Sequence, residues 1–367
     1  MASEGSLPLC VHALGWFEGR FGYNTHTRNF FDRLSLLKPV TISPMIGLEG
    51  PWEEDRQLLL QTPNLTPHAT IALLYGNLMG ILDDAPGRRI AYTVWESTKY
   101  PDDWIGPLSR ADEIWIPSKW GRDVLIDNGL PAERIHVVPE GVDPILFNPD
   151  IAPTEALKSF NGFKFLNIGR YEERKGTAKL IKCFDRAFGS NDEAVLVLAC
   201  DNQHDPDFNI GKILRDLELQ HPERIAFIPP VRSHARLAEI YRSCDAFVSP
   251  FRAEGWGLPV IEAMACGLPV IATGYSGPTE FLGDTAYSID FRLTDIDIPY
   301  FDASDSNYGQ WADPDEDHLI ALMREVYAER EAAKRRGLQG SNHVIENFSW
   351  DHAAQKAAAR LDEAISR

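Results

Sequence analysis

Two glutamates, Glu254 and Glu262, are spaced so that both lie near the start of one predicted helix. The apolar residues 246–248 predict a strand, a loop containing Gly255 follows, and Pro259 suits the first helical turn, where its missing N–H costs nothing. Free amides at a helix N-terminus attract anions, so carboxylates beside it are poorly placed to bind a phosphate themselves. They are well placed to accept hydrogen bonds from the hydroxyls of a ligand whose phosphate occupies the helix end. Sugar nucleotides, in which a diphosphate joins two polyols, are such ligands.

A second charged segment, residues 169–176, follows one predicted strand and precedes a predicted helix. It carries Arg170 and Lys175 five positions apart. When a glycosidic bond to a diphosphate breaks, negative charge develops on the leaving group, and without a metal fixed cations must stabilise it. The two side chains could form such a clamp, although a solvated charged loop would show the same composition.

A glycine-bearing turn, residues 15–22, lies between a predicted strand at 9–14 and a predicted helix at 25–37. Strand, glycine turn and helix form the arrangement that cradles phosphate. The turn lacks the G-x-G-x-x-G fingerprint of dinucleotide sites, which removes the main sequence support for a nicotinamide-dependent enzyme.

Strand and helix patterns alternate along the rest of the chain, which is typical of parallel sheets with helical crossovers. Apolar runs predict further strands at residues 90–95, 113–117, 135–138, 163–169, 194–200, 225–228, 246–249 and 270–273. Further helices are predicted at residues 118–128, 177–188, 210–220, 235–243, 259–267, 313–328 and 350–365. Residues 291–310 are aspartate-rich and weakly patterned, so we expect a surface excursion there.

The length of the chain and a segment rich in proline together predict two domains. The chain has 367 residues, more than one core usually supports. Residues 139–150 hold three prolines and a glycine without periodicity, as interdomain linkers do. We therefore expect an α/β protein of two doubly wound Rossmann-like domains, residues 1–150 and 151–345, with the ligand in a cleft at the carboxyl ends of their strands.

Composition narrows the partners and the compartment. The formal net charge of −18 argues against a general nucleic-acid or anionic-membrane binder. Five scattered cysteines without metal-ligand spacing indicate buried free thiols in a reducing compartment, so we expect a cytoplasmic protein. The longest apolar stretch, residues 69–82, is too short to span a bilayer. We expect no transmembrane segment, which still leaves room for peripheral membrane contact.

The charged segments together resemble a known family. Gly169-Arg170-x4-Lys175-Gly176, about eighty residues before Glu254-x7-Glu262, is similar to the donor-site signature of retaining glycosyltransferases of family 4, which have the GT-B fold. Further matches cover nearly the whole chain: Gly141-Val142-Asp143, Phe147-x-Pro149, residues 267–273 and Phe348-Ser349-Trp350.

The resemblance implies a donor site and a domain arrangement. Glu262 would bind the ribose hydroxyls, Glu254 the transferred sugar, and Arg170 with Lys175 the diphosphate. The backbone amides of Gly255, Trp256, Gly257 and Leu258 would assist Glu254. An amide near Gly22 would touch the phosphate, and the base would lie along Pro230, Val231, Arg232 and Ser233. The two domains would face a central cleft, with the helix of residues 346–367 crossing back to the first domain.

The chain departs from this family at one position. Many members carry a histidine after the fourth strand of the first domain, near the transferred sugar. This strand is followed here by Glu96, which could position the acceptor hydroxyl or bind the sugar. A helix cap or a surface acid is the alternative. In this family the retaining step looks like a front-face substitution, in which the leaving phosphate takes the acceptor proton, so we do not expect Glu96 to be a nucleophile.

The leading hypothesis is a metal-independent retaining glycosyltransferase, a hexosyltransferase of polysaccharide biosynthesis, that needs no cofactor. Its partners would be a nucleotide sugar and a glycan, glycolipid or glycoprotein acceptor. The alternatives are a sugar-nucleotide epimerase or phosphorylase and a non-catalytic glycan-binding partner. Asp313-Pro314-Asp315 has the D-x-D form of metal-dependent GT-A enzymes, but aspartate is also a good helix cap. The aromatic residues Trp16, Phe17, Tyr23, Trp95, Tyr100 and Trp104 fit either a saccharide site or a core.

Overall fold

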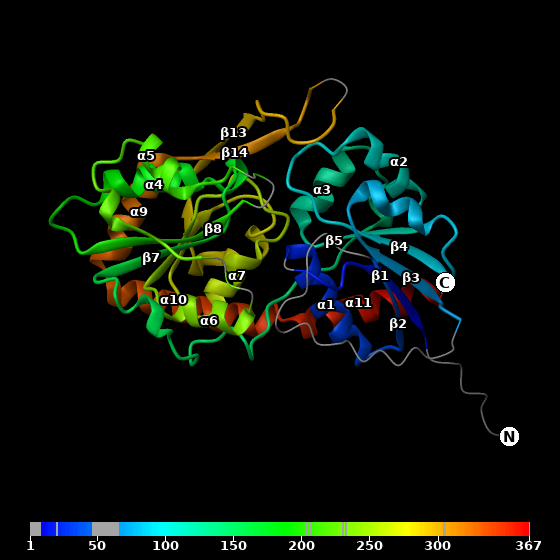
Figure 1. Cartoon of the computed structure of the whole chain (residues 1–367). Helices are drawn as coiled ribbons and strands as arrows, with labels where there is room; N and C mark the ends of the chain where they lie inside the picture. Colours follow the sequence, from blue (N-terminus) through cyan, green and yellow to red (C-terminus); the bar gives the residue numbers. More distant parts are fainter. Residues whose placement is uncertain are drawn as a thin grey trace. The chain divides into compact units, whose positions relative to one another are not determined.

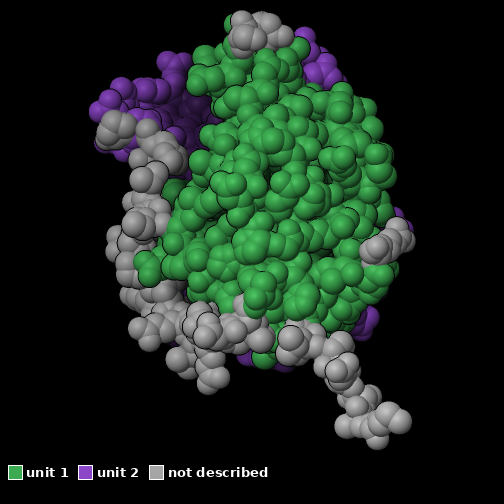
Figure 2. All heavy atoms as spheres, turned by 90° about the vertical axis from the view of Figure 1, so that its right-hand side faces the viewer, with its two compact units in different colours: residues 1–141, 298–308, 348–367 green, residues 142–297, 309–347 purple. Residues whose placement is uncertain are grey.

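The computed structural model describes residues 9–19, 21–45, 66–202, 205, 207–229, 231, 233–303 and 306–366. The chain divides into two compact units (Figure 2). Unit 1 comprises residues 1–141, 298–308 and 348–367, and unit 2 comprises residues 142–297 and 309–347.

Unit 1 is built on a six-stranded parallel sheet with the order β2-β1-β3-β4-β5-β6. Its strands are β1 (Val11–Gly15), β2 (Val40–Pro44), β3 (Ala69–Leu73), β4 (Arg88–Tyr92), β5 (Glu113–Ile116) and β6 (Ile135–Val137). Its helices are α1 (Gly22–Ser35), α2 (Asp102–Arg110), α3 (Lys119–Asp127) and α11 (Trp350–Ile365), with 3₁₀ turns η1 (Gly76–Leu82) and η2 (Ala132–Arg134).

Unit 2 is built on a second six-stranded parallel sheet with the order β12-β11-β10-β7-β8-β9. Its strands are β7 (Phe163–Arg170), β8 (Ala194–Asp201), β9 (Ile225–Phe227), β10 (Ala246–Ser249), β11 (Val270–Thr273) and β12 (Tyr287–Ile289). Its helices are α4 (Thr177–Ala187), α5 (Ile210–Asp216), α6 (His234–Arg242), α7 (Leu258–Ala265), α8 (Thr279–Leu282), α9 (Glu316–Ala328) and α10 (Arg330–Asn347), and its 3₁₀ turns are η3 (Glu155–Leu157), η4 (Glu173–Lys175), η5 (Pro222–Arg224) and η6 (Gly283–Thr285).

The apolar pattern explains why these layers form. Strands β3 and β10 are buried at every position, as expected for parallel strands covered on both faces. Helix α4 buries Leu180, Ile181 and Phe184, which share one face at helical spacing, in the core of unit 2. Each such side chain contributes about 1.5–3 kcal/mol when fully buried. The predicted architecture of two doubly wound α/β sheets is confirmed.

The final helix belongs to unit 1, as expected from the resemblance. Helix α11 packs along α1 (Figure 1), and its buried face is rich in alanine, which allows the two helices a close approach. Arg360 of α11 donates to Glu113 of β5 at 2.8 and 3.0 Å, and Asp362 pairs with Lys38 at 2.6 Å.

The aspartate-rich segment is more ordered than its composition indicates. It forms β13 (Phe291–Asp295) and β14 (Gln310–Pro314), an antiparallel hairpin of unit 2. The helix predicted from residue 313 begins at Glu316 instead, because residues up to Pro314 pair in this hairpin and Asp315 caps α9 by accepting from the amide of His318. Of the residues between the two strands, 298–308 are assigned to unit 1.

Candidate functional site

The residues expected to bind the diphosphate and the transferred sugar in unit 2 lie at the point where its strand order reverses. Strands β7 and β10 are neighbours in the sheet, but along the chain β7 is followed by β8 and β10 by β11. Their carboxyl ends therefore form a topological switch point. The segment with Arg170 and Lys175 follows β7, and the loop with Glu254 follows β10. The topology therefore brings the two predicted motifs to one edge of the sheet.

Gly176 allows these two loops to touch. Its φ of +66° is a left-handed conformation that favours glycine. A Cβ atom there would lie 2.2 Å from the carbonyl oxygen of Pro250, in the loop after β10, so no larger residue fits without a backbone shift. The close approach places Lys175, the preceding residue, beside Glu254.

A buried cluster of charges joins the two loops. Nζ of Lys175 donates to Oε1 of Glu254 at 2.5 Å, and Nη1 of Arg174 lies 3.3 Å from Oε2 of the same carboxylate. Arg174 also donates to the carbonyl oxygen of Ala253 at 2.7 Å. The side chain of Glu254 is only 7% exposed, so these cations act on it in a low-dielectric environment.

The cluster continues to Arg170 through Glu172. Glu172 accepts from Arg174 at 2.7 Å and lies 3.3 Å from Nη1 of Arg170. Burial alone raises the pKa of Glu172, but the charges of Arg174, Lys175 and Arg170 outweigh burial and hold this pKa below its ordinary value. We call Arg170, Glu172, Arg174, Lys175 and Glu254 the charge cluster; with both acids ionised it carries one net positive charge.

The segment after β11 fixes the position of the loop from Glu254 to Leu258 by two hydrogen bonds. The amide of Glu254 donates to Oγ of Ser276, and the amide of Gly277 donates to the carbonyl oxygen of Glu254, both at 2.9 Å. A Cβ atom on Gly277 would lie 2.1 Å from the carbonyl oxygen of Gly255, so this packing also requires glycine.

Trp256 and Gly257 turn that loop into helix α7. The Trp256 ring is 2% exposed and packs on Phe281 with centroids 5.1 Å apart. Gly257 has a φ of +96° and is the N-cap residue of α7, which then begins at Leu258. Gly255, Trp256, Gly257 and Leu258 therefore all lie at the N-terminus of this helix, as predicted from Pro259.

Glu262 lies on the second turn of α7 and is buried. Tyr241 of α6 donates its hydroxyl to Oε2 of Glu262 at 3.0 Å. Burial raises the pKa of Glu262 to about 8, because this hydrogen bond offsets only part of the desolvation of the carboxylate. Burial also raises the pKa of Tyr241 well above its ordinary value, so the phenol remains the donor.

The expected base-binding segment is described in part. Val231 is half-buried and precedes Ser233, which caps α6 by accepting from the amide of Arg236 at 3.3 Å. Pro230 and Arg232 lie outside the described residues.

In unit 1 the first glycine turn leads into a helix N-terminus. Gly22 is the first residue of α1, and Phe21 precedes it as the N-cap. Asn24 holds the turn together, since its Oδ1 accepts from the amide of Phe21 at 2.9 Å and its Nδ2 donates to the carbonyl oxygens of Trp16 and Glu18. The arrangement that was expected to cradle phosphate is thus formed in unit 1.

Glu96 follows β4 and is half-buried. It is not the cap of a helix, because α2 begins at Asp102 with Pro101 as its N-cap. Its carboxylate accepts from the hydroxyl of Tyr300, at 3.1 Å. The preceding residue, Trp95, packs on Trp104 with ring centroids 4.6 Å apart and on Tyr300 at 5.4 Å.

The predicted aromatic residues divide between core and surface. Phe17, Trp95, Tyr100 and Trp104 are at most 8% exposed and belong to the core. Trp16 is half-buried and contacts Tyr23 and Tyr75 with ring centroids 5.9 and 5.2 Å apart, and Tyr75 is 43% exposed. Because these residues follow the parallel strands β1 and β3, their rings gather at the carboxyl edge of the sheet of unit 1.

The sequence analysis missed several residues of these sites, among them Glu172, Arg174, Tyr241 and Tyr300. Glu172 and Arg174 lie inside the matched motif at positions that the motif leaves unspecified. Tyr241 precedes Glu262 by 21 positions on another helix, and Tyr300 lies 204 positions after Glu96, so only tertiary packing reveals either partner.

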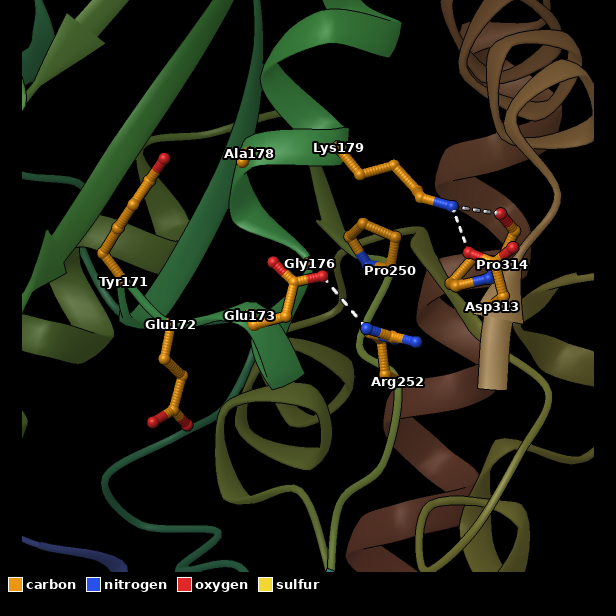
Figure 3. Close-up of a pocket in the computed structure, with 10 residues that line it drawn as sticks. All are labelled: Tyr171, Glu172, Glu173, Gly176, Ala178, Lys179, Pro250, Arg252, Asp313 and Pro314. Atoms are coloured by element: carbon orange, nitrogen blue, oxygen red, sulfur yellow. Dashed lines mark hydrogen bonds and ion pairs between the residues drawn. The ribbon is translucent and has the colours of Figure 1, made fainter. Parts of the chain in front are cut away.

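A small cavity of about 120 Å³ lies beside the charge cluster in unit 2 (Figure 3). Of the described residues, it is lined by Tyr171, Glu172, Glu173, Gly176, Ala178, Lys179, Pro250, Arg252, Asp313 and Pro314, and not by Lys175 or Glu254. It is smaller than the roughly 300–1,000 Å³ typical of small-molecule pockets. Its walls carry two ion pairs, Lys179 with Asp313 at 2.5 Å and Arg252 with Glu173 at 3.0 Å. We therefore do not place the donor in this cavity.

The D-x-D pattern has a structural use in this fold. Asp313 pairs with Lys179 and with Arg292, at 2.5 and 3.0 Å, and Asp315 caps α9. Among the described residues, no group of three or more histidine, cysteine, aspartate or glutamate side chains has the spacing of a metal site. Over the same ranges, no helix combines the length and the apolar character needed to cross a membrane.

Known proteins are similar to this chain in sequence. Residues 154–294, in unit 2, match the family model described as Glycosyl transferases group 1. The chain is 28% identical over 269 residues to a D-inositol 3-phosphate glycosyltransferase of Mycobacteroides abscessus, covering 71% of this chain and 53% of the relative. It is 29% identical over 250 residues to a mannosylfructose-phosphate synthase of Agrobacterium fabrum, covering 65% and 50%. The chain thus spans about half the length of the curated relatives it matches.

Solved structures share the whole fold at low sequence identity. The sucrose-phosphate synthase of Thermosynechococcus elongatus superposes with a TM-score of 0.71 at 16% identity, over 98% of this chain and 99% of that one. HepE of Anabaena, solved in complex with UDP and glucose, superposes with a TM-score of 0.69 at 15% identity, over 97% and 100%. The two sheets therefore have the GT-B glycosyltransferase fold, and the match to the glycosyltransferase family model lies in unit 2.

Proposed function

We propose that this protein is a retaining glycosyltransferase of family 4 that moves a hexose from a nucleotide-diphosphate donor to a hydroxyl acceptor. The observation that carries the proposal is the charge cluster, in which Lys175 and Arg174 from the loop after β7 meet Glu254 from the loop after β10. A carboxylate and several cations at a sheet switch point are suited to a ligand with both hydroxyls and phosphates.

The cluster can act differently on the donor before and after the glycosidic bond breaks. Arg170 and Lys175 would contact the diphosphate, whose negative charge grows as it leaves the sugar. Cations fixed in a water-poor site stabilise that developing charge without reorganising, which accelerates the chemical step rather than binding alone. Arg174 would not contact the diphosphate. Its hydrogen bonds to Ala253 and Glu172 hold the two loops in position.

Glu254 would bind hydroxyls of the transferred hexose. Its carboxylate is already oriented by two cations, and its backbone is fixed by Ser276 and Gly277. The amides at the start of α7, from Gly255 to Leu258, would assist it, since a helix N-terminus favours negatively charged and oxygen-rich groups.

Glu262 would bind the two ribose hydroxyls of the nucleotide. It lies on the same helix as this N-terminus, one to two turns further along, which separates a ribose site from a phosphate site by a suitable length of donor. A hydroxyl can replace Tyr241 as a donor to the carboxylate, or share it with Tyr241, so binding would favour the ionised form of Glu262.

The proposed reaction breaks the bond between the anomeric carbon and the diphosphate oxygen, and forms a bond from the same carbon to the acceptor oxygen on the same face. The acceptor proton goes to the departing phosphate oxygen. Glu96 would orient the acceptor hydroxyl and form no covalent bond. The step requires no metal in this proposal, because Arg170 and Lys175 supply the positive charge.

The substrates follow from the names of related proteins and from composition. Several similar structures were solved with UDP, so we propose a uridine donor as the first to test. The acceptor is a glycan, a glycolipid or a glycoprotein in polysaccharide biosynthesis; the relatives named for inositol phosphate and fructose phosphate make a phosphorylated polyol the second choice. Five free cysteines, all buried, favour a cytoplasmic site of action.

A thermal-shift screen with UDP, GDP and ADP tests donor binding. A ligand present at a hundred times its dissociation constant stabilises the native state by about 2.7 kcal/mol, which raises Tm by several degrees. We expect one of the three diphosphates to do so and uridine alone to do much less. If none raises Tm and no sugar nucleotide is cleaved, the proposal is wrong.

Product analysis then identifies the reaction class. The matching sugar nucleotide is incubated with and without glucose, and the products are followed by NMR. A new glycoside with the donor's anomeric configuration supports retaining transfer. A changed sugar nucleotide without an acceptor would indicate an epimerase, phosphate-dependent cleavage a phosphorylase, and binding without turnover a non-catalytic partner.

A further inference from the structure

The hairpin of β13 and β14 carries a connection much longer than it needs. The last ladder bond, from the amide of Ile296 to the carbonyl oxygen of Gly309 at 2.9 Å, could be closed by two residues. Hairpin loops usually have two to five residues, and long ones in compact domains are usually functional. Residues 298–303 and 306–308, which we call the arm, leave the hairpin and belong to unit 1.

The arm contacts three consecutive residues after β4. The rings of Tyr300 and Phe301 each lie 5.4 Å from the Trp95 ring, and Oγ of Ser97 donates to the carbonyl oxygen of Tyr308 at 2.5 Å. Between these two anchors, the carboxylate of Glu96 accepts from Tyr300. Trp95 and Ser97 are buried, so Tyr300, Phe301 and Tyr308 anchor the arm on packed residues of unit 1, while residues 298, 299, 302, 306 and 307 of the arm are exposed.

The hydrogen bond from Tyr300 restricts the Glu96 carboxylate. An acceptor that is ionised makes a stronger hydrogen bond than a neutral one, and partial burial strengthens it further. With Oε2 held at 3.1 Å by the phenol, the carboxylate has one preferred orientation. The ring of Tyr300 is half-buried and packs on the core residue Trp95, so it can still offer apolar surface of the kind on which sugar rings stack.

We propose that the arm forms part of the acceptor site of unit 1 and that Tyr300 is a positioning residue, which orients Glu96 toward the acceptor hydroxyl. The acceptor is therefore a saccharide or polyol whose recognition depends on this arm. The inference rests on the proposed glycosyl transfer. It adds to unit 1 an element of acceptor specificity, the arm, which lies in the sequence between two strands of unit 2.

The first test compares two tyrosine-to-phenylalanine variants. Tyr300→Phe removes the hydroxyl that bonds Glu96. Tyr327→Phe removes a hydroxyl that accepts from the amide of Glu193 at 3.1 Å in unit 2, outside the arm, so it is the matched control. Wild type and both variants are assayed for UDP release from UDP-glucose, alone and with glucose, maltose or D-inositol 3-phosphate as the acceptor.

The readout is the contrast between acceptor use and donor use. We expect Tyr300→Phe to lower kcat/KM for the acceptor by about 10- to 100-fold, the range for losing a hydrogen bond to a charged group. Hydrolysis of UDP-glucose without acceptor, and the Tm shift caused by UDP, should stay within about twofold of wild type. Tyr327→Phe should match wild type in all three measurements.

A second variant tests the arm as a whole. Replacing residues 297–308 by Asn-Gly closes the hairpin with a two-residue turn. It should abolish acceptor-dependent UDP release while keeping the Tm shift with UDP, and Glu96→Gln should resemble Tyr300→Phe or be more severe.

The outcomes separate the two proposals. If wild type transfers glucose and Tyr300→Phe keeps the full acceptor kcat/KM, or loses hydrolysis equally, the arm inference is wrong and the proposed function stands. If wild type binds no UDP and shows no acceptor-dependent release with any of the three acceptors, both are wrong.

Discussion

The ammonium of Lys175 lies 2.5 Å from the carboxylate of Glu254, although 79 positions separate the two residues in the chain. They meet because β7 and β10 are adjacent in the sheet and because Gly176 lets one loop pack on the carbonyl oxygen of Pro250. Lys175 is therefore held at the switch point before any diphosphate arrives.

Replacing Lys175 by alanine should lower kcat by roughly 10²–10³, the usual cost of one charge-stabilising donor. Lys179→Ala is the control, since it removes the same charge from the adjoining helix, where Lys179 pairs with Asp313. Steady-state UDP release at saturating donor measures both. Equal rates for the two variants would contradict the role of Lys175 in leaving-group stabilisation.

Replacing Glu262 by glutamine should weaken nucleotide binding and leave kcat nearly unchanged, because ribose is bound alike in the ground and transition states. Glutamine keeps the size of the side chain and can still accept from Tyr241. Titration calorimetry with UDP should show an affinity loss of about tenfold or more, as for a hydrogen bond to a charged group. A kcat defect with unchanged affinity would assign Glu262 to the chemical step instead.

The same substitution should change how stability depends on pH. The pKa of Glu262 is about 8 in the folded protein and 4.5 in an unstructured chain, so the folded state binds the extra proton between these values. Stability must then fall as pH rises from 4.5 to 8. Glu262→Gln removes this loss, so its advantage in the free energy of unfolding should grow toward pH 8, with an upper limit of about 5 kcal/mol.

Urea unfolding at several pH values between 6 and 8.5 measures this trend, and Glu113→Gln is the control of opposite sign. Burial raises the pKa of Glu113, but hydrogen bonds from Arg360 and Trp115 lower it below its ordinary value. Its ionised form therefore stabilises the fold above pH 4.5, and Glu113→Gln should be destabilising over the whole range. Parallel pH curves for wild type and Glu262→Gln would contradict the prediction.

Replacing Arg174 by methionine should lower the free energy of unfolding by about 3–5 kcal/mol, because it leaves Glu172 and Glu254 buried with one cation fewer. Arg186→Met removes an arginine whose side chain is 47% exposed and which pairs with Glu316 and Asp317, so it should cost less than about 1 kcal/mol. Urea denaturation of both variants distinguishes a buried network from a surface one. Similar costs would show that Arg174 does not hold the two loops together.

Chelation should leave transfer unaffected, because the proposal assigns leaving-group stabilisation to protein cations. UDP release is measured before and after dialysis against EDTA, and then with Mg²⁺ or Mn²⁺ restored. A loss of activity that either ion reverses would assign part of this role to a metal.

The buried parallel strands could be predicted closely from the sequence, since each one is a short apolar run. Strands β10 and β11 have the predicted limits, and α4 ends one residue before the predicted end. The apolar runs of the strands and the 3.6-residue apolar repeat of the helix both result from burial. Burial determines which side chains are apolar, so both patterns are visible in the sequence. Because parallel strands end at one edge, the sequence also predicted that the loops with Arg170 and Glu254 lie together.

The features set by packing between distant segments could not be predicted. Strand β13 is exposed at most positions, so no apolar pattern marks it. The arm is assigned to unit 1 by contacts with Trp95, which no local pattern encodes. The hydrogen bond from Tyr241 to Glu262 depends equally on the meeting of two helices, and so does the burial that raises the pKa of Glu262.

The chain runs from unit 1 to unit 2 and then returns to unit 1 in α11, so the order of translation affects how the protein folds. Residues 142–297 complete the sheet of unit 2, and residues 309–347 add the helices that cover it, so this unit can fold before α11 emerges. Unit 1 has all its strands by Val137, yet the face of α1 that meets α11 stays uncovered until residues 348–366 emerge. During that interval the nascent chain presents an apolar helix surface for chaperones, and truncation within α11 should leave unit 1 unfinished while unit 2 remains native-like.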